Sequence, residues 1–274
     1  NIYGKPMASA EALTWLGEHF RVSLSQCRPE LDQLFLSGVN HVVYHGTTYS
    51  PQSAGWPGWL FYASVEFVPN NSFWTHFPGL NEYITRTQAV LQSGRPDNDI
   101  LLYWPVHDTW HTNGKPDMQI SIHNIDEWLH PSDFYKSASE LQEYGYLTDF
   151  ASDAVIHALK ASKGKVYASG VGGMYKAIIV PSCQFMPLET FQKLIYLAQQ
   201  GVPVIFKEMP ADVPGFHNLV ERRRIFEDAI TALDFGKTGS VESAKTAAGR
   251  ILRSSSLKDA LELEIGRASC RERV

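Results

Sequence analysis

The sequence lacks several features that would assign a protein to a functional class at once. No apolar run approaches the roughly 18 residues that a membrane-spanning helix needs, and Lys and Arg form no cluster of the kind that binds nucleic acid. Charged residues make up 19% of the 274 residues, and the formal net charge is −5. We therefore expect neither a nucleic-acid nor a membrane partner, and the composition leaves the oligomeric state unknown.

Cysteine is scarce, with only Cys27, Cys183 and Cys270 in the chain. Their spacing fits neither a zinc motif nor a disulfide framework, so cysteine usage does not indicate a compartment. Cys183 follows a predicted strand, where a catalytic nucleophile could lie, but the flanking glycines of a nucleophile turn are missing. We predict a buried or loop cysteine there, and an amidotransferase-type enzyme is a weaker alternative.

Two further motifs are incomplete. His107 and His111 have the spacing that binds zinc on a helix, but nearby Pro, Asn and Gly residues predict a loop, so no metal site is expected. A dinucleotide fingerprint requires a helix after its glycines. The glycines at 170, 172 and 173 are instead followed by a predicted strand. We interpret them as a hairpin turn.

Aromatic residues, in contrast, are plentiful, with 7 Trp, 12 Tyr and 14 Phe. Trp gathers in the first half, above all in an irregular segment at 52–76 that also contains Pro, Gly and Asn. A loop of this length is usually functional or disordered, and its aromatic content argues against disorder. Indole rings stack on sugars, although Trp more often fills a core.

The first 96 residues show the pattern of successive βα repeats. Small residues lead to Glu11, helices are predicted at 13–24 and 29–37 with Pro29 at a helix start, and a strand at 39–45 ends at His45. A further helix is predicted at 80–91. In (β/α)8 barrels the chemistry lies at the carboxyl ends of strands, where Glu11 and His45 would both stand.

The pattern resets after Pro96, so we place a domain boundary between 96 and 97. Strands are predicted at 99–104, 146–150, 165–168, 177–180 and 202–206, and helices at 131–143, 153–160, 187–200 and 219–233. Alternating strands and helices predict a parallel sheet with helices on both faces. The fold class is α/β: the last strands of a barrel at 1–96, then a flavodoxin-like or amidotransferase-like domain at 97–263.

Both ends of the chain predict a fragment of a longer protein. It starts at Asn1 without Met or a signal peptide. Residues 264–274 resemble the in-frame translation of a sequencing adapter, and we treat this tail as non-biological, as with a fusion scar.

A series of motifs in the first 96 residues resembles glycoside hydrolase family 106, the α-L-rhamnosidases of plant-polysaccharide degraders. The motifs are YGKP at 3–6, SAE at 9–11, GVNH at 38–41, YHG at 44–46, GWLF at 58–61, NSFW at 71–74, YITRTQ at 83–88 and LQSG at 91–94. Residues 99–261 resemble the amidotransferase-like domain that follows the barrel in such enzymes.

The resemblance implies an inverting hydrolase that acts through two glutamates on opposite faces of the sugar. Glu11 matches the general base, and the general acid would come from a strand upstream of Asn1, so the fragment alone is expected to be inactive. His45 and Tyr44 would contact sugar hydroxyls, and Trp56 and Trp74 would stack on a sugar. The partner is an oligosaccharide or polysaccharide substrate.

The resemblance leaves some alternatives open. The stretch WLFYAS at 59–64 departs from the family pattern, so the sugar could differ from rhamnose. In the related family 42 β-galactosidases the matching carboxylate is a nucleophile of a retaining mechanism, and a non-catalytic carbohydrate-binding module is a further alternative. No cofactor is expected in this fragment. The family implies possible calcium in the full-length enzyme, and a periplasmic or secreted location.

Overall fold

A computed structural model describes residues 1–112, 120–168 and 172–266. The chain divides into two compact units. One comprises Lys5–Pro96, and the other comprises Asn1–Gly4 together with the chain from Asp97. The predicted turn that begins at Gly170 lies partly outside the described residues. Cys270 and most of the predicted tail lie wholly outside them.

The Lys5–Pro96 unit is a β-α-β-α arrangement. Strand β1 (Ser9–Ala12) is followed by α1 (Leu24–Leu36), and β2 (His41–Tyr44) pairs parallel to β1. After β2 come two short 3-10 turns, η1 (Gln52–Ala54) and η2 (Trp74–His76), and then α2 (Phe77–Ser93). Two parallel strands joined by a helix form one βα repeat of the kind that builds α/β folds.

The two faces of this small sheet differ in character. Side chains alternate along a strand, so Ala12 and its register partner Tyr44 point to one side and Glu11 and its partner Val43 to the other. Ala12 and Tyr44 join the apolar core under α1 and α2, whereas Glu11 and Val43 are exposed. Packing therefore orients the Glu11 carboxylate away from the core.

The helix predicted at 13–24 is wrong. Leu13 and Phe20 have positive φ values of 65° and 62°, which a right-handed helix excludes, and the segment is irregular. Helix α1 starts at Leu24, where the side chain of Gln26 accepts a hydrogen bond from the Ser23 N–H. Pro29 lies inside α1 and not at its start.

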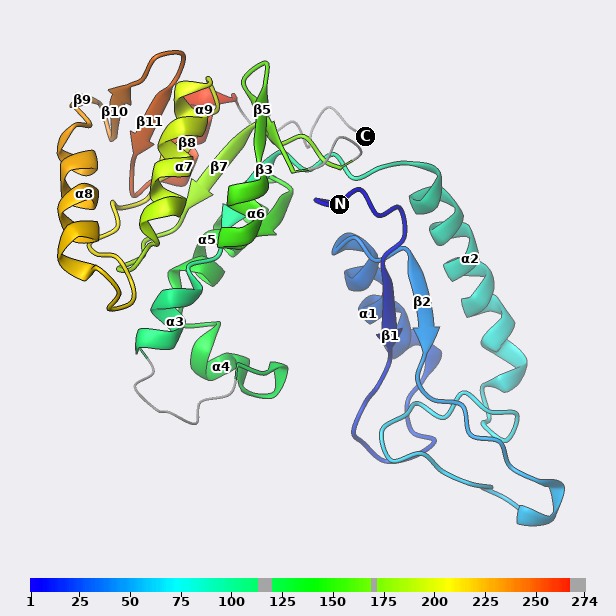
Figure 1. Cartoon of the computed structure of the whole chain (residues 1–274). Helices are drawn as coiled ribbons and strands as arrows, with labels where there is room; N and C mark the ends of the chain where they lie inside the picture. Colours follow the sequence, from blue (N-terminus) through cyan, green and yellow to red (C-terminus); the bar gives the residue numbers. More distant parts are fainter. Residues whose placement is uncertain (113–119, 169–171, 267–274) are drawn as a thin grey trace. The chain divides into compact units, whose positions relative to one another are not determined.

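The second unit is built on a seven-stranded sheet in the order β4-β3-β7-β8-β11-β10-β9 (Figure 1). The first five strands in this order are parallel, and β10 and β9 add an antiparallel edge. The strands are β3 (Ile100–Tyr103), β4 (Thr148–Ala151), β7 (Ala177–Val180), β8 (Val204–Phe206), β9 (Phe235–Thr238), β10 (Val241–Lys245) and β11 (Arg250–Arg253). A separate hairpin comprises β5 (Lys160–Ser162) and β6 (Lys165–Tyr167).

Helices cover both faces of this sheet. One apolar cluster contains residues of α5 (Asp133–Glu143) and α9 (Leu257–Glu264), and the other contains residues of α6 (Asp153–Ala158), α7 (Leu188–Gln199) and α8 (Leu219–Thr231). Successive residues of β3 alternate between the clusters, with Leu101 in one and Leu102 in the other. The predicted parallel sheet with helices on both faces is confirmed.

The loop predicted around His107 and His111 is wrong, because both residues lie on α3 (Val106–Thr112). Pro105 precedes the first turn of α3, a position that proline tolerates. The Asp108 carboxylate accepts the N–H groups of Gln184 and Phe185, at 2.7 Å each, which anchors the helix. Short elements η3 (Ile122–Asn124) and α4 (Ile125–Trp128) precede α5.

Within the described part of the chain, no helix is both long and apolar enough to span a bilayer.

Candidate active site

Glu11 lies at the carboxyl end of β1 with its side chain 63% exposed. His45 follows directly after β2, the neighbouring strand. Because β1 and β2 are parallel, their carboxyl ends meet at the same edge of the sheet. The structure therefore brings these two predicted site residues together, although they are 34 positions apart in the chain.

Thr14 connects the two side chains. Its hydroxyl lies 2.9 Å from Nδ1 of His45 and donates a longer hydrogen bond, of 3.5 Å, to Oε2 of Glu11. Nδ1 of His45 is 3.8 Å from the same carboxylate oxygen. A carboxylate next to a hydroxyl and an imidazole can accept a proton or attack an electrophile, and this geometry suits either role.

The His45 ring is supported by Phe61. The two rings meet edge to face with centroids 4.6 Å apart. Phe61 also lies over Gly46, where an added Cβ would come within 3.3 Å of the ring. A side chain at position 46 would therefore press against the group that supports His45.

Ser64 fixes the main chain after His45. Its hydroxyl accepts the Gly46 N–H at 3.0 Å and donates to the Gly46 carbonyl at 2.8 Å. The His45–Gly46 peptide bond is cis. Ser64 is buried and also accepts the Glu66 N–H at 2.7 Å, so one hydroxyl links the end of β2 to the segment around Glu66.

Glu66 is a fully buried carboxylate that the sequence reasoning did not identify. Its Oε1 accepts the N–H of Phe61 at 3.1 Å and lies 3.0 Å from Nδ1 of His19. Among the described residues, its Oε2 has no hydrogen-bond partner. The sequence contained one sign of it, a single acidic residue in the largely apolar run ASVEFV at 63–68. Such an acid indicates a buried carboxylate with a partner, because an ionised carboxylate is rarely buried without one.

Three other predicted site residues lie apart from the Glu11–His45 pair. Tyr44 packs against Phe67 and Phe77, and its hydroxyl donates to Asn81 of α2 at 2.7 Å. Burial raises the pKa of the Tyr44 phenol above its usual range. Trp74 packs against Phe77 at the start of α2, and Trp56, which is 76% exposed, packs against Phe20.

A profile of the alpha-L-rhamnosidase family, glycoside hydrolase family 106, matches residues 1–268. The chain belongs to glycoside hydrolase family 106. In the curated relative "Putative beta-glucuronidase" from Formosa agariphila, 23% of 209 aligned residues are identical. That alignment covers 75% of this family 106 chain and 16% of the relative.

Solved structures show a similar fold. The rhamnosidase from Novosphingobium sp. PP1Y matches 96% of this family 106 chain with a TM-score of 0.69 and 19% identity. A GH42 β-galactosidase from G. stearothermophilus matches 90% of it with a TM-score of 0.54 and 10% identity. The chain spans 23% and 40% of these two proteins, respectively.

Cys183 of the family 106 chain is unsuited to be a nucleophile. Its thiol is buried, and burial, together with the charges of Asp108, Asp153 and Asp133, raises the pKa above its usual range. A thiol nucleophile needs the opposite shift, toward the thiolate. The prediction of a buried cysteine is confirmed.

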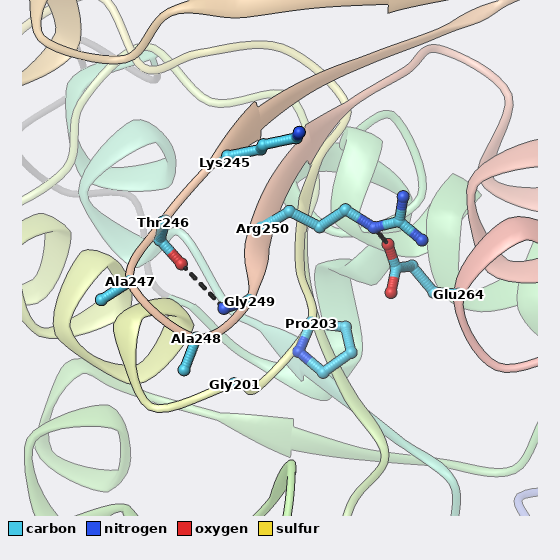
Figure 2. A pocket seen from close by; sticks show the side chains of 9 residues that line it. All are labelled: Gly201, Pro203, Lys245, Thr246, Ala247, Ala248, Gly249, Arg250 and Glu264. Atoms are coloured by element: carbon cyan, nitrogen blue, oxygen red, sulfur yellow. Dashed lines mark hydrogen bonds and ion pairs between the residues drawn. The ribbon is translucent and has the colours of Figure 1, made fainter.

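The second unit of the family 106 chain contains a cavity of about 490 Å³ at the turn between β10 and β11 (Figure 2). Residues 245–250, at this turn, contribute to its lining, and the Gly249 N–H donates a hydrogen bond of 3.2 Å to the Thr246 hydroxyl. Arg250 pairs with Glu264 at its margin. We assign no function to this cavity.

Proposed function

We propose that this family 106 chain is part of an enzyme that removes terminal α-L-rhamnose from plant-type glycans with inversion, and that Glu11 is its general base. The observation that carries the proposal is the exposed Glu11 carboxylate beside His45, at the carboxyl ends of two adjacent parallel strands. The chain spans only 16% of the putative beta-glucuronidase and 23% of the rhamnosidase named above, so the activity proposed is that of the whole protein.

We further propose that β1 and β2 are late strands of a (β/α)8 barrel. The supporting features are the parallel pairing, the helices on one side only, and the exposed face that carries Glu11. The second unit fits a flavodoxin-like, amidotransferase-like domain. Without the β5–β6 hairpin and the antiparallel edge, five parallel strands remain, in the spatial order β4-β3-β7-β8-β11. Numbered along the chain, this order is second, first, third, fourth, fifth, which is the flavodoxin order.

In the proposed reaction, Glu11 takes a proton from a water molecule. The water oxygen bonds to the anomeric carbon as the bond to the leaving oxygen breaks, and a general acid on an upstream strand protonates that oxygen. Thr14 holds both Glu11 and His45, and His45 would contact sugar hydroxyls. Trp56 and Trp74 remain candidates for stacking on the sugar, whereas Tyr44 supports β2 from the core.

The calcium that the family resemblance implies enters no step of this proposal. Among the described residues, no group of three or more His, Cys, Asp or Glu side chains could hold a metal ion. Export of the full-length parent to the periplasm or medium is also a proposal. Fractionation of the source cells, followed by detection of the parent protein, would test it.

The test is Glu11→Gln in the full-length parent protein, assayed on an aryl α-L-rhamnoside. Loss of the base is expected to lower kcat by about 10²- to 10⁴-fold, the usual contribution of acid–base catalysis. Glu30→Gln, an exposed acid on α1, is the matched control and should retain full activity. Wild-type turnover in Glu11→Gln would refute the assignment of the base.

The same assay separates two alternatives. A retaining hydrolase with Glu11 as nucleophile is favoured by the fold similarity to a GH42 β-galactosidase. NMR of the first-formed product distinguishes them, because inversion gives the β-anomer of rhamnose and retention the α-anomer. A non-catalytic carbohydrate-binding module would bind the glycan in both the wild type and the Glu11→Gln variant and release no product from either.

A further inference from the structure

The second unit has a cavity of about 270 Å³ at the carboxyl ends of two adjacent strands, β3 and β7. Trp104 follows β3, Ser182 follows β7, and both line the cavity. From β3 the chain continues to α5 on one face of the sheet, and from β7 it continues to α7 on the other face. Such a switch point is where open α/β sheets bind ligands.

Two indole rings contribute to the lining. Trp104 and Trp128 are both half-buried, so part of each ring stays accessible. The indole N–H of Trp128 donates to the Ser121 carbonyl at 2.9 Å, which fixes the orientation of the ring. The Trp104 ring packs against Phe134 with centroids 6.5 Å apart. Both rings are therefore held in place before any ligand arrives.

The charges of the lining are of one sign. Asp108, Glu127 and Asp133 line the cavity, and no Lys or Arg does among the described residues. Lys207 lies behind Asp133, 3.0 Å from its Oδ1, and is shared with Glu140. Phosphates and uronates would meet net negative charge here, whereas neutral hydroxyl groups find carboxylate acceptors.

We propose that this cavity is a second, non-catalytic saccharide site that takes one neutral hexose ring of the glycan. Indole faces bind the apolar C–H side of a sugar, and the Asp, Glu and Ser182 side chains accept or donate hydrogen bonds at its hydroxyls. A volume of about 270 Å³ suits a single sugar ring and excludes a dinucleotide. The choice of a sugar as ligand rests on the proposed function.

The test follows the indole ¹⁵N–H resonances of the complete 274-residue chain during titration with methyl α-L-rhamnopyranoside. Trp128→Ala and other single Trp variants assign the signals. The resonances of Trp104 and Trp128 are expected to shift, whereas glucuronate at the same concentration should leave them unchanged. Ser182→Phe, which fills the cavity, should abolish the shift of Trp104, and its thermal unfolding serves as the check of folding.

Two tryptophan variants measure the affinity. Trp128→Ala should weaken binding, followed at the Trp104 resonance, by about tenfold, in the range of one lost aromatic contact. Trp110→Ala removes an exposed indole of α3 that does not line the cavity, so it should not change the affinity for the sugar. Unshifted Trp104 and Trp128 signals at saturating sugar, or a shift that survives Ser182→Phe, would overturn the proposal. An inactive parent enzyme with these shifts intact would count against the proposed function alone.

Discussion

Asp153 accepts hydrogen bonds from two fully buried side chains of the second unit. Its Oδ1 accepts hydrogen bonds from the hydroxyls of Tyr103, at 2.8 Å, and Thr190, at 2.6 Å. Nε2 of His107 lies 3.5 Å from the other oxygen. Burial acts to raise the pKa of Asp153, but the hydrogen bonds from His107, Thr190 and Tyr103 together hold it below its usual range.

This lowered pKa predicts an acid-sensitive contribution to stability. The contribution is fully present above the unfolded carboxyl pKa of about 3.9 and is lost as the pH falls from there through the lower folded pKa. Asp153→Asn should reduce the free energy of unfolding at neutral pH by about 1–3 kcal/mol, the range for loss of hydrogen bonds to a charged group.

Urea unfolding at pH 7 and at a pH below the folded pKa checks this. The difference between Asp153→Asn and wild type should shrink in acid. The exposed Asp234→Asn is the control and should behave like the wild type at both values. An equal loss at both pH values would show that the carboxylate charge contributes nothing.

At the residue scale, the sequence predicted that Glu11 and His45 lie together, but it did not predict the buried Glu66. Glu11 and His45 could be placed together because each follows a recognisable strand and parallel strands end at one edge. Glu66 could not be placed, because its role depends on Phe61 and His19, which reach it through irregular chain. No periodicity predicts which residues such a segment brings into contact.

Among the elements, α1 contains a destabilising residue. Pro29 is exposed and lies in the interior of this 13-residue helix. It has no N–H to donate to the Ser25 carbonyl, four residues before it, and its ring crowds that carbonyl. Helix α1 persists because its other face buries Cys27, Leu31 and Phe35; tertiary packing outweighs propensity here.

Pro29→Ala should therefore stabilise the Lys5–Pro96 unit. The full difference in helix propensity is about 3 kcal/mol, and about 0.4–1 kcal/mol of it is offset because proline also restricts the unfolded chain. We expect a gain of about 1–3 kcal/mol, measured by denaturant unfolding followed at the Trp fluorescence of this unit. Glu30→Ala, the exposed neighbour, is the control and should change little. A loss of stability in Pro29→Ala would mean that the ring makes a favourable contact.

The elements that the sequence predicted are the ones with strong apolar patterns. Strand β7 follows a continuous apolar run and is buried along its whole length, and helix α2 buries residues three and four positions apart, as a helical period requires. Strands β9, β10 and β11 and helix α9 were not predicted. Segments such as FGKT and VESAK are short and mostly polar, and they form strands only because β11 pairs with β8 and extends the sheet. The irregular 13–22 segment has apolar residues at helical spacing, but backbone conformations at Leu13 and Phe20 prevent a helix.

At the scale of the whole molecule, the two units differ in how completely their sheets are covered. The seven-stranded sheet has an apolar cluster on each face, and β3, β7 and β8 are buried along their length. The β1–β2 sheet has two strands and one exposed face, with Val43 49% exposed. A two-stranded sheet is marginal in water without further strands or packing.

Hydrogen exchange of the complete 274-residue chain should therefore be uneven. Amides of β3, β7 and β8 should exchange only through global unfolding of their unit, whereas those of β1 and β2 should exchange at least about tenfold faster, through openings that cost less free energy. If the proposed barrel is correct, the same β1 and β2 amides should become protected in the full-length parent, where further strands would pair with the edges of this two-stranded sheet. Equal protection of β1 and β2 in the 274-residue chain and in the parent would contradict the barrel, because no further strands would then pair with them.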